Sequence, residues 1–184
     1  MDQTETGEPY GSIRYRRTNG RNERLQQIFR RKRKGKEMRI RRVTGKRESY
    51  LHLLLLADEQ MEMIREYLNQ GDMVVLEDGG ICGECIVTDA GDGVLEIRNL
   101  AVLPGRQRKG YGRAMIEYIA EHYRDRYSFL QAGTGDSPLT VPFYEACGFT
   151  RQHAEKDYYT VHYDHPIVEQ GMQLRDRIIL RRTL

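Results

Sequence analysis

Glycines and cations gather between residues 106 and 113, in the sequence RQRKGYGR. Gly110 and Gly112 carry no side chain, so the backbone around them can approach a ligand closely. Apolar residues then recur at the spacing of a helix with one buried face: Tyr111, Ala114, Met115, Tyr118 and Ile119. The start of such a helix leaves N–H groups unpaired. Four cationic side chains surround them: Arg106, Arg108, Lys109 and Arg113. This combination predicts an anion site and is typical of one for a pyrophosphate.

Two other kinds of glycine loop compete for this stretch. A P-loop requires Lys and then Ser or Thr after its last glycine, but Tyr111 and Gly112 follow Gly110. A dinucleotide-binding loop requires a third Gly or Ala at position 115, where Met115 stands. Spacing therefore excludes both. A solvated basic turn that caps a helix stays open as an alternative when this loop is considered alone.

The loop resembles the (Gln/Arg)-x-x-Gly-x-(Gly/Ala) motif of the GNAT superfamily of N-acetyltransferases, which holds the pyrophosphate of acetyl-coenzyme A. A second stretch agrees: residues 141–149, VPFYEACGF, are similar to the family's Phe-Tyr-Glu-x-x-Gly-Phe helix. Gly148 suits the left-handed position that ends such a helix. The resemblance covers about residues 38–184. It implies that acetyl-coenzyme A is bound by Leu100, Ala101, Val102, Gln107, Arg108, Lys109, Gly110, Tyr111, Gly112 and Arg113. No metal is expected, because the five histidines never pair four residues apart and none stands at ligand spacing from carboxylates.

The same resemblance implies two catalytic side chains. Tyr144 matches the family tyrosine that protonates the leaving thiolate, and a phenol with a pKa of ~10 suits that role. Its alternative is an aromatic ring packed in the core. Glu96 stands four residues before Leu100, where some members carry a general base for an amine whose pKa is ~10. Its alternative is a structural carboxylate paired with Arg98 or an adjacent strand. The N–H of Leu100 would stabilise negative charge on the thioester oxygen.

These residues need a sheet to position them. Residues 94–103 are almost continuously apolar, which predicts a strand inside a sheet. Further strands are predicted over residues 38–43, 73–76, 81–88 and 127–132, the last of them parallel to the central strand. Residues 133–138 read as a loop, and residues 158–163 and 172–180 as two β segments. The expected fold class is α/β: a mixed, mostly antiparallel central sheet flanked by helices. A splayed parallel strand pair is implied by the resemblance.

Two helices are predicted before the hairpin at residues 77–80, over residues 47–57 and from Asp58 to Gln70, with Asp58 as N-cap. In the family, helices here cover the acceptor site. The acids Asp58, Glu59 and Glu62 would therefore either meet a cationic amine or stabilise the helix dipole.

The composition indicates one domain. The chain has 184 residues and is 39% hydrophobic, enough for a single core. No stretch approaches the ~18 to 20 apolar residues of a membrane span, and the N-terminus lacks the core of a signal peptide. Three cysteines suit a reducing cytoplasm. The lone pair Cys82 and Cys85 lies in an apolar strand, where residues three apart point to opposite faces, so buried inert thiols are expected instead of a zinc site.

The basic charge belongs to the first 37 residues. They carry 11 Lys and Arg against 5 Asp and Glu, a net charge of +6, which leaves 19 against 22, or −3, for residues 38–184. Few apolar groups occur in residues 1–37, so this tail is predicted to be disordered and residues 38–184 to form the acetyltransferase domain. The tail would bind nucleic acid or another polyanion, or it is a solvated extension upstream of a functional start at Met38.

The predicted activity is transfer of an acetyl group from acetyl-coenzyme A to a primary amine, by direct transfer in a ternary complex. The negative charge of residues 38–184 favours a small cationic amine. A protein or peptide amine is the first alternative. The alternative of another class is a non-catalytic coenzyme A-binding module whose basic tail binds nucleic acid. A homodimer is compatible with the sequence.

Overall fold

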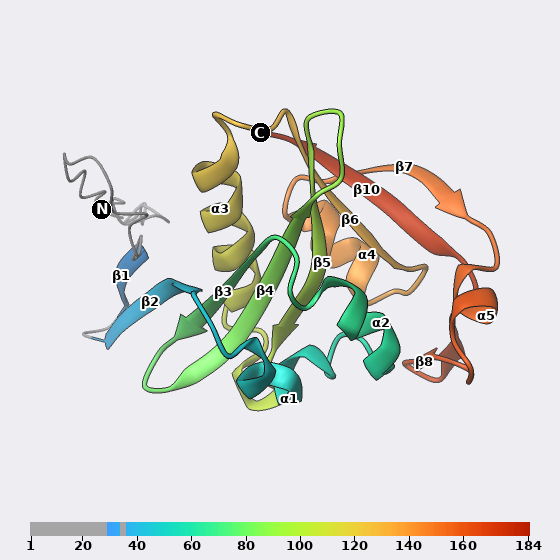
Figure 1. Ribbon diagram of the computed structural model, residues 1–184, viewed down its shortest axis with the longest axis horizontal. Helices are drawn as coiled ribbons and strands as arrows, with labels where there is room; N and C mark the ends of the chain where they lie inside the picture. The colour runs from blue at the N-terminus through green and yellow to red at the C-terminus, as the bar shows by residue number, and fades with distance from the viewer. Residues whose placement is uncertain (1–28, 34–35) are drawn as a thin grey trace, which may run out of the picture.

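The computed structural model describes residues 29–33 and 36–184. In this part of the chain, eight strands form one sheet in the order β1-β2-β3-β4-β5-β6-β10-β7 (Figure 1). All neighbouring strands are antiparallel except β5 and β6, which are parallel. The predicted fold class, a mostly antiparallel sheet with one parallel pair and flanking helices, is confirmed.

The strands of this sheet are β1 (Phe29–Arg33), β2 (Lys36–Val43), β3 (Asp72–Glu77), β4 (Ile81–Asp89), β5 (Val94–Val102), β6 (Phe129–Gly135), β7 (Thr150–Glu155) and β10 (Arg177–Thr183). A separate small pair consists of β8 (Val168–Glu169) and β9 (Met172–Gln173). The helices are α1 (Leu51–Leu54), α2 (Met61–Tyr67), α3 (Tyr111–Tyr123), α4 (Thr140–Ala146) and α5 (Tyr158–His162), with 3₁₀ turns η1 (Arg47–Tyr50) and η2 (Pro104–Arg106).

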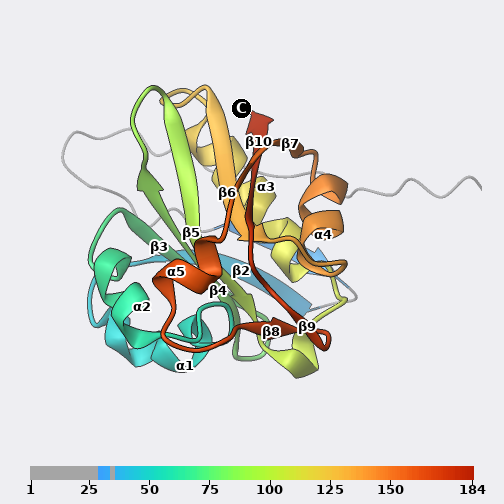
Figure 2. The same cartoon turned by 90° about the vertical axis from the view of Figure 1, so that its right-hand side faces the viewer.

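Helices cover both faces of the sheet, with α1 and α2 on one side and α3 and α4 on the other (Figure 2). Successive side chains of a strand point to opposite faces. In β3, Val74 and Leu76 therefore join the core under α3 and α4, whereas Met73 and Val75 join the core under α1 and α2. Burial on both faces explains why the central strands are apolar almost throughout.

Pairing between β5 and β6 ends halfway along β5. The parallel ladder runs only from Val94 to Ile97, although β5 stays paired with β4 as far as Val102. Strand β6 instead follows β10 to Gly135. Backbone groups of residues 98–102 on the β6 side therefore lack ladder partners, and the two strands splay apart.

Strand β1 lies inside the segment that is predicted to be a tail. Its backbone pairs with β2, from Phe29 opposite Ile40 to Arg33 opposite Lys36. Regular pairing thus begins before the predicted domain boundary at Met38. The other residues of the predicted tail, 1–28 and 34–35, lie outside the described residues, and their disorder stays a prediction.

The helices before β3 are shorter than predicted. The first is a 3₁₀ turn followed by the single turn α1, and the second begins at Met61 after an extended Gln60. The prediction that Asp58 caps this helix is therefore wrong. Its carboxylate accepts the backbone N–H of Gln60 (3.3 Å), which lies before the helix, and the hydroxyls of Tyr67 (3.1 Å) and Tyr163 (3.2 Å). Asp58 therefore joins the helix start to a distant segment instead of capping the helix.

The C-terminal third departs furthest from the prediction. Residues 158–163, predicted as β, contain α5, and the strand lies earlier, at β7. The side chains of β7 are mostly exposed, so it shows no apolar alternation that would identify it. In α5 the rings of Tyr158 and His162 stack at 4.3 Å, and those of Tyr159 and Tyr163 stack at 5.4 Å. Contacts between residues four apart favour a helix despite the β propensity of these types. Strand β6 also extends into the predicted loop, to Gly135.

Cys82 and Cys85 are buried free thiols. Both belong to the core under α3 and α4, so the prediction that they point to opposite faces is wrong. The register between β3 and β4 shifts at Cys82, where Leu76 pairs with Gly83 and Glu77 with Ile81. A bulge of this kind inserts one extra residue and resets the alternation.

Candidate active site

Helix α3 begins at the predicted glycine loop. Gly110 precedes its first turn with φ 83°, a left-handed conformation that favours glycine. A Cβ at Gly110 would have no heavy atom within 4 Å, so the space beside this backbone is open. The side chains of Gln107, Arg108, Lys109 and Arg113 are exposed around it. An open, cationic N-terminus of a 13-residue helix fits a pyrophosphate.

Side-chain contacts hold this loop against its neighbours. The Gln107 amide donates to the carbonyl of Val102 (3.1 Å), and the Lys109 ammonium donates to the carbonyl of Gly105 (3.0 Å). Arg113, in the same turn of α3 as Gly112, donates to the carbonyl of Ala146 at the end of α4 (2.7 Å).

Tyr111 plays a supporting part in this loop. Its ring is buried, and its hydroxyl donates to Asp78 in the β3–β4 turn (2.6 Å). Its side chain therefore packs in the core, and only its backbone is available to bind a cofactor.

Tyr144 projects from α4 into the core under α3. It is 8% exposed and contacts Phe143 and Phe149 edge to face, at 5.2 and 5.3 Å between ring centroids. Burial raises the pKa of Tyr144, with a smaller contribution from Cys85, so the phenol keeps its proton at neutral pH. Cys85 pairs with Leu100 across β4 and β5, which places Tyr144 near the splayed half of β5.

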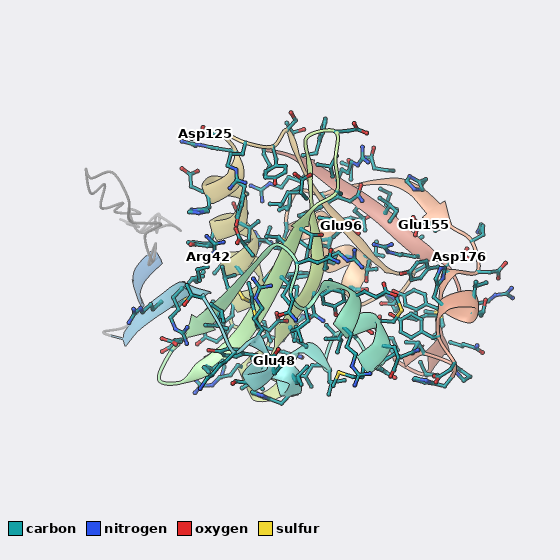
Figure 3. The ribbon with its side chains drawn as sticks, viewed as in Figure 1. Arg42, Glu48, Glu96, Asp125, Glu155 and Asp176 are labelled. Atoms are coloured by element: carbon teal, nitrogen blue, oxygen red, sulfur yellow. The ribbon has the colours of Figure 1, made fainter. Side chains whose placement is uncertain are left out.

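Glu96 is held by an arginine from the other end of the chain. Its carboxylate pairs with Arg177 of β10, and the two side chains are only 12% and 18% exposed. Arg177 also pairs with Glu155 (3.3 Å), and its guanidinium lies 4.9 Å from the centre of the Tyr158 ring. Figure 3 labels the two carboxylates, Glu96 on β5 and Glu155 on β7. Burial lowers the pKa of Arg177, but the charges around it, with Glu96 first, outweigh burial and raise it.

Gly133 makes this ion pair possible. A Cβ on Gly133 would lie 2.0 Å from Nε of Arg177, so the missing side chain lets the guanidinium cross β6 toward β5. Glu96 is thus a carboxylate in a structural ion pair, as its alternative interpretation predicted. Its partner comes from β10, two strands away, and not from Arg98 or from an adjacent strand.

Two buried polar residues near β5 were not predicted as site residues. Glu84 on β4 is fully buried, and neither of its carboxylate oxygens has a hydrogen-bond partner. Burial raises the pKa of Glu84 to about 8, although the nearby backbone N–H of Ala101 on β5 opposes the rise. Asn99 donates to the carbonyl of Leu54 (3.1 Å) and to the hydroxyl of Tyr67 (2.8 Å), while its amide oxygen has no partner. A carboxylate inside the apolar run ICGECIV was the one available signal in the sequence.

Tyrosines line the same side of the sheet. The hydroxyls of Tyr67 and Tyr163 meet at Asp58, and burial raises the pKa of that carboxyl group. The backbone N–H of Asp164 donates to the side chain of Gln60 (3.3 Å). The segment after α5 therefore packs on the connection between α1 and α2.

In the part of the chain that the structure describes, no three His, Cys, Asp or Glu side chains group in a way that could hold a metal ion. None of the described helices has the length and apolar character needed to cross a membrane.

Comparison with known proteins agrees with this geometry. A family model described as an acetyltransferase (GNAT) domain matches residues 69–151. YvbK of Bacillus subtilis, an uncharacterised N-acetyltransferase, is 32% identical over 131 residues, which cover 70% of this chain and 84% of YvbK.

Solved structures are similar over most of the chain. The IAA acetyltransferase from Bacillus cereus has 32% identity and a TM-score of 0.74, with 80% of this chain and 99% of that chain covered. A Bacillus subtilis acetyltransferase in complex with CoA has 30% identity and a TM-score of 0.73, over 80% and 99%. A GNAT family acetyltransferase from Elizabethkingia anophelis with acetyl-CoA bound has 28% identity and a TM-score of 0.75, over 80% and 98%.

The splayed strands, the glycine loop at the start of α3 and these relatives lead to one assignment. The chain belongs to the GNAT superfamily of N-acetyltransferases. It is an acyltransferase that uses acetyl-coenzyme A as its co-substrate.

Proposed function

We propose that the enzyme transfers the acetyl group directly to a primary amine of a small cationic molecule, in a ternary complex. The observation that carries this proposal is the divergence of β5 from β6 after Ile97, between the start of α3 and the position of Tyr144. It leaves backbone groups of β5 unpaired beside a cationic loop and a buried phenol. An extended cofactor arm with amide groups suits such a strand edge.

The roles follow from this geometry. Arg108, Lys109 and the N–H groups of residues 110–113 bind the pyrophosphate. The backbone of residues 100–102 binds the pantetheine arm, and the N–H of Leu100 stabilises the negative charge that develops on the thioester oxygen. Tyr144 gives its proton to the sulfur as the C–S bond breaks.

Glu96 is the general base suggested by the family resemblance. One of its oxygens already accepts the guanidinium of Arg177, which leaves the other for a proton or a water molecule. Its ion pair also orients the carboxylate at the splay. The base assignment is therefore tested separately below.

Acidic and aromatic side chains on the acceptor side support a cationic substrate. Asp58 lies half-buried between two tyrosine hydroxyls, and Glu96 and Glu84 project from the neighbouring strands. Carboxylates in a low-dielectric setting attract ammonium groups, and tyrosine faces bind cations. The residues 38–184 also carry a net charge of −3.

The test is release of coenzyme A thiol with a panel of amines. The panel contains polyamines, aminoglycosides, monoamines without a second charge, and short peptides with a free N-terminus. We expect turnover with polycationic small amines above the rate of acetyl-coenzyme A hydrolysis alone. Turnover confined to peptides would transfer the assignment to a protein or peptide acceptor. Thiol release that no amine increases would overturn the proposal.

A further inference from the structure

Three buried oxygen atoms without partners lie on the acceptor face of the sheet. They are the two carboxylate oxygens of Glu84 and the amide oxygen of Asn99. Both residues are almost completely buried, at 0% and 3% exposure. Buried polar atoms are normally hydrogen-bonded, so unpaired ones that share one region indicate that a donor-bearing ligand is missing.

Strand register places these atoms close together. Glu84 pairs with Ala101, and Ile86 pairs with Asn99, so Glu84 and Asn99 are diagonal neighbours across β4 and β5. Diagonal neighbours are roughly 7–8 Å apart, within the reach of a long side chain. Glu84 shares a face with Ile86, which packs under α1 and α2, and Asn99 contacts Leu54 and Tyr67 of those same helices.

Once Glu84 is ionised, all three unpaired atoms are acceptors, so their missing partner is a group rich in N–H donors. An alkylammonium carries three N–H donors and no acceptor. The residue beside Glu84 is Ala101, whose backbone lies in the splayed half of β5. An amine bound to these oxygens would therefore lie next to the proposed position of the thioester.

From this geometry we propose that Glu84 and Asn99 bind the amino group of the acceptor and that Glu84 is the base that takes its proton. The proposal rests on the proposed amine acetyltransferase function and names the site that receives the amine. Asn99 accepts one N–H and thereby orients the nitrogen, while Glu84 accepts the proton that must leave.

The proton balance is complete within the site. Glu84, as a carboxylate, takes one proton from the ammonium group and leaves a neutral amine. The nitrogen lone pair forms the new C–N bond to the acetyl carbon, and the C–S bond breaks. Tyr144 gives its proton to the sulfur and is reprotonated with the second proton that the nitrogen loses. Glu84 then releases its proton to solvent.

Glu84 is better placed for this role than Glu96. An oxygen of Glu96 already accepts the guanidinium of Arg177, whereas no side chain hydrogen-bonds to either oxygen of Glu84. Four titratable or charged groups lie around Glu84 on the acceptor face: Tyr67, Asp58, Arg98 and Glu96. Cys85 and Tyr144 lie toward the other face of the sheet. Apart from Arg98, which lies 5.2 Å from the Tyr67 ring, none of them carries positive charge that would hold Glu84 ionised before the amine arrives.

The test compares Glu84→Gln, Glu96→Gln and an exposed control, Glu66→Gln on α2, with the best amine of the panel. We expect Glu84→Gln to lower kcat by ~10² or more with the acetyl-coenzyme A dissociation constant within twofold. Glu96→Gln should lower kcat by less than tenfold, and Glu66→Gln should leave it unchanged. Asn99→Ala should raise the amine KM more than it lowers kcat, because Asn99 orients the nitrogen without accepting its proton.

The pH profile provides an independent readout. In the wild type, kcat/KM should rise to a shoulder near pH 8, where Glu84 ionises. In Glu84→Gln the rise of kcat/KM with pH should instead follow the ionisation of the amine itself, whose pKa is ~10. Circular dichroism confirms that each variant is folded, and Glu84→Asp, which keeps the carboxylate one methylene further back, should retain the limb near pH 8 at a lower rate.

Three results would overturn the inference. The first is normal kcat in folded Glu84→Gln together with a ~10²-fold loss in Glu96→Gln, which would return the base to Glu96. The second is a tenfold or larger loss of acetyl-coenzyme A affinity in Glu84→Gln, which would make Glu84 a cofactor ligand. In both cases the wild type still acetylates amines and the proposed function stands. A wild type that no amine activates would overturn the proposed function and this inference together.

Discussion

Replacing Glu84 by Gln should stabilise the ligand-free protein at neutral and alkaline pH. Burial raises the pKa of Glu84 from its ordinary value of 4.5 to about 8 in the folded chain. In the unfolded chain the same carboxyl ionises at its ordinary value. Between these two pH values the folded state holds one more proton than the unfolded state, so the free energy of unfolding falls as pH rises.

The magnitude follows from the width of that window. Each pH unit inside it costs about 1.4 kcal/mol of unfolding free energy. Relative to pH 4, the wild type has therefore lost roughly 3 kcal/mol at pH 7 and roughly 5 kcal/mol above pH 8. Glutamine has the same shape and no charge at any pH. Glu84→Gln avoids this loss while keeping a buried polar group similar to the protonated acid.

The assay is urea unfolding of the wild type and Glu84→Gln at pH 4.5, 7 and 8.5. The difference between their unfolding free energies should be near zero at pH 4.5 and about 3 kcal/mol in favour of the variant at pH 7, roughly 6–12 °C in Tm for a domain of this size. Glu66→Gln, on the exposed face of α2, should follow the wild type at each pH. A constant difference across pH, or a variant less stable than wild type at pH 7, would refute the reasoning, because Glu84 would then be ionised and favourably paired in the folded state.

Three further predictions concern the cofactor loop, the acid and the tail. Gly110→Asp should weaken acetyl-coenzyme A binding by ~10² or more, because a Cβ at φ 83° and a negative charge both oppose the anion; an unchanged calorimetric dissociation constant in a folded variant would show that the loop is misassigned. Tyr144→Phe should lower kcat by ~10² or more with the same acetyl-coenzyme A affinity, whereas equal rates from pH 6 to 9 would leave Tyr144 a packing residue. The fragment 38–184 should fold and acetylate amines like the full chain with Tm lower by less than ~4 °C, since among the described residues it loses only the edge strand β1 and the first two residues of β2; lost turnover with intact cofactor affinity would mean that residues 1–37 help to form the acceptor site.

The features that the sequence predicted correctly depend on neighbours in the chain. Gly148 adopts the left-handed conformation predicted for the end of α4, which a residue without Cβ takes without strain. The apolar run of residues 94–103 predicts a strand covered on both faces, and β5 lies inside the sheet. The glycine loop and the residues 141–149 therefore predict the cofactor side of the site from local sequence alone.

Only the tertiary structure decided the acceptor side. Glu96 meets Arg177, 81 positions away, because β10 inserts between β6 and β7 and Gly133 leaves room for the guanidinium. The polar β7 is a strand because β10 supplies its hydrogen-bond partners, while its own side chains show no pattern.

Glu84 shows the same division most clearly. The sequence places a carboxylate in an apolar strand, but the strand register and the cover of α1 and α2 determine that its oxygens are buried beside Asn99 without partners. Local spacing determines backbone conformation and which residues can form a helix or strand. Which distant side chains meet, and which buried groups stay unpaired, depends on register and layer packing that no local window of residues contains.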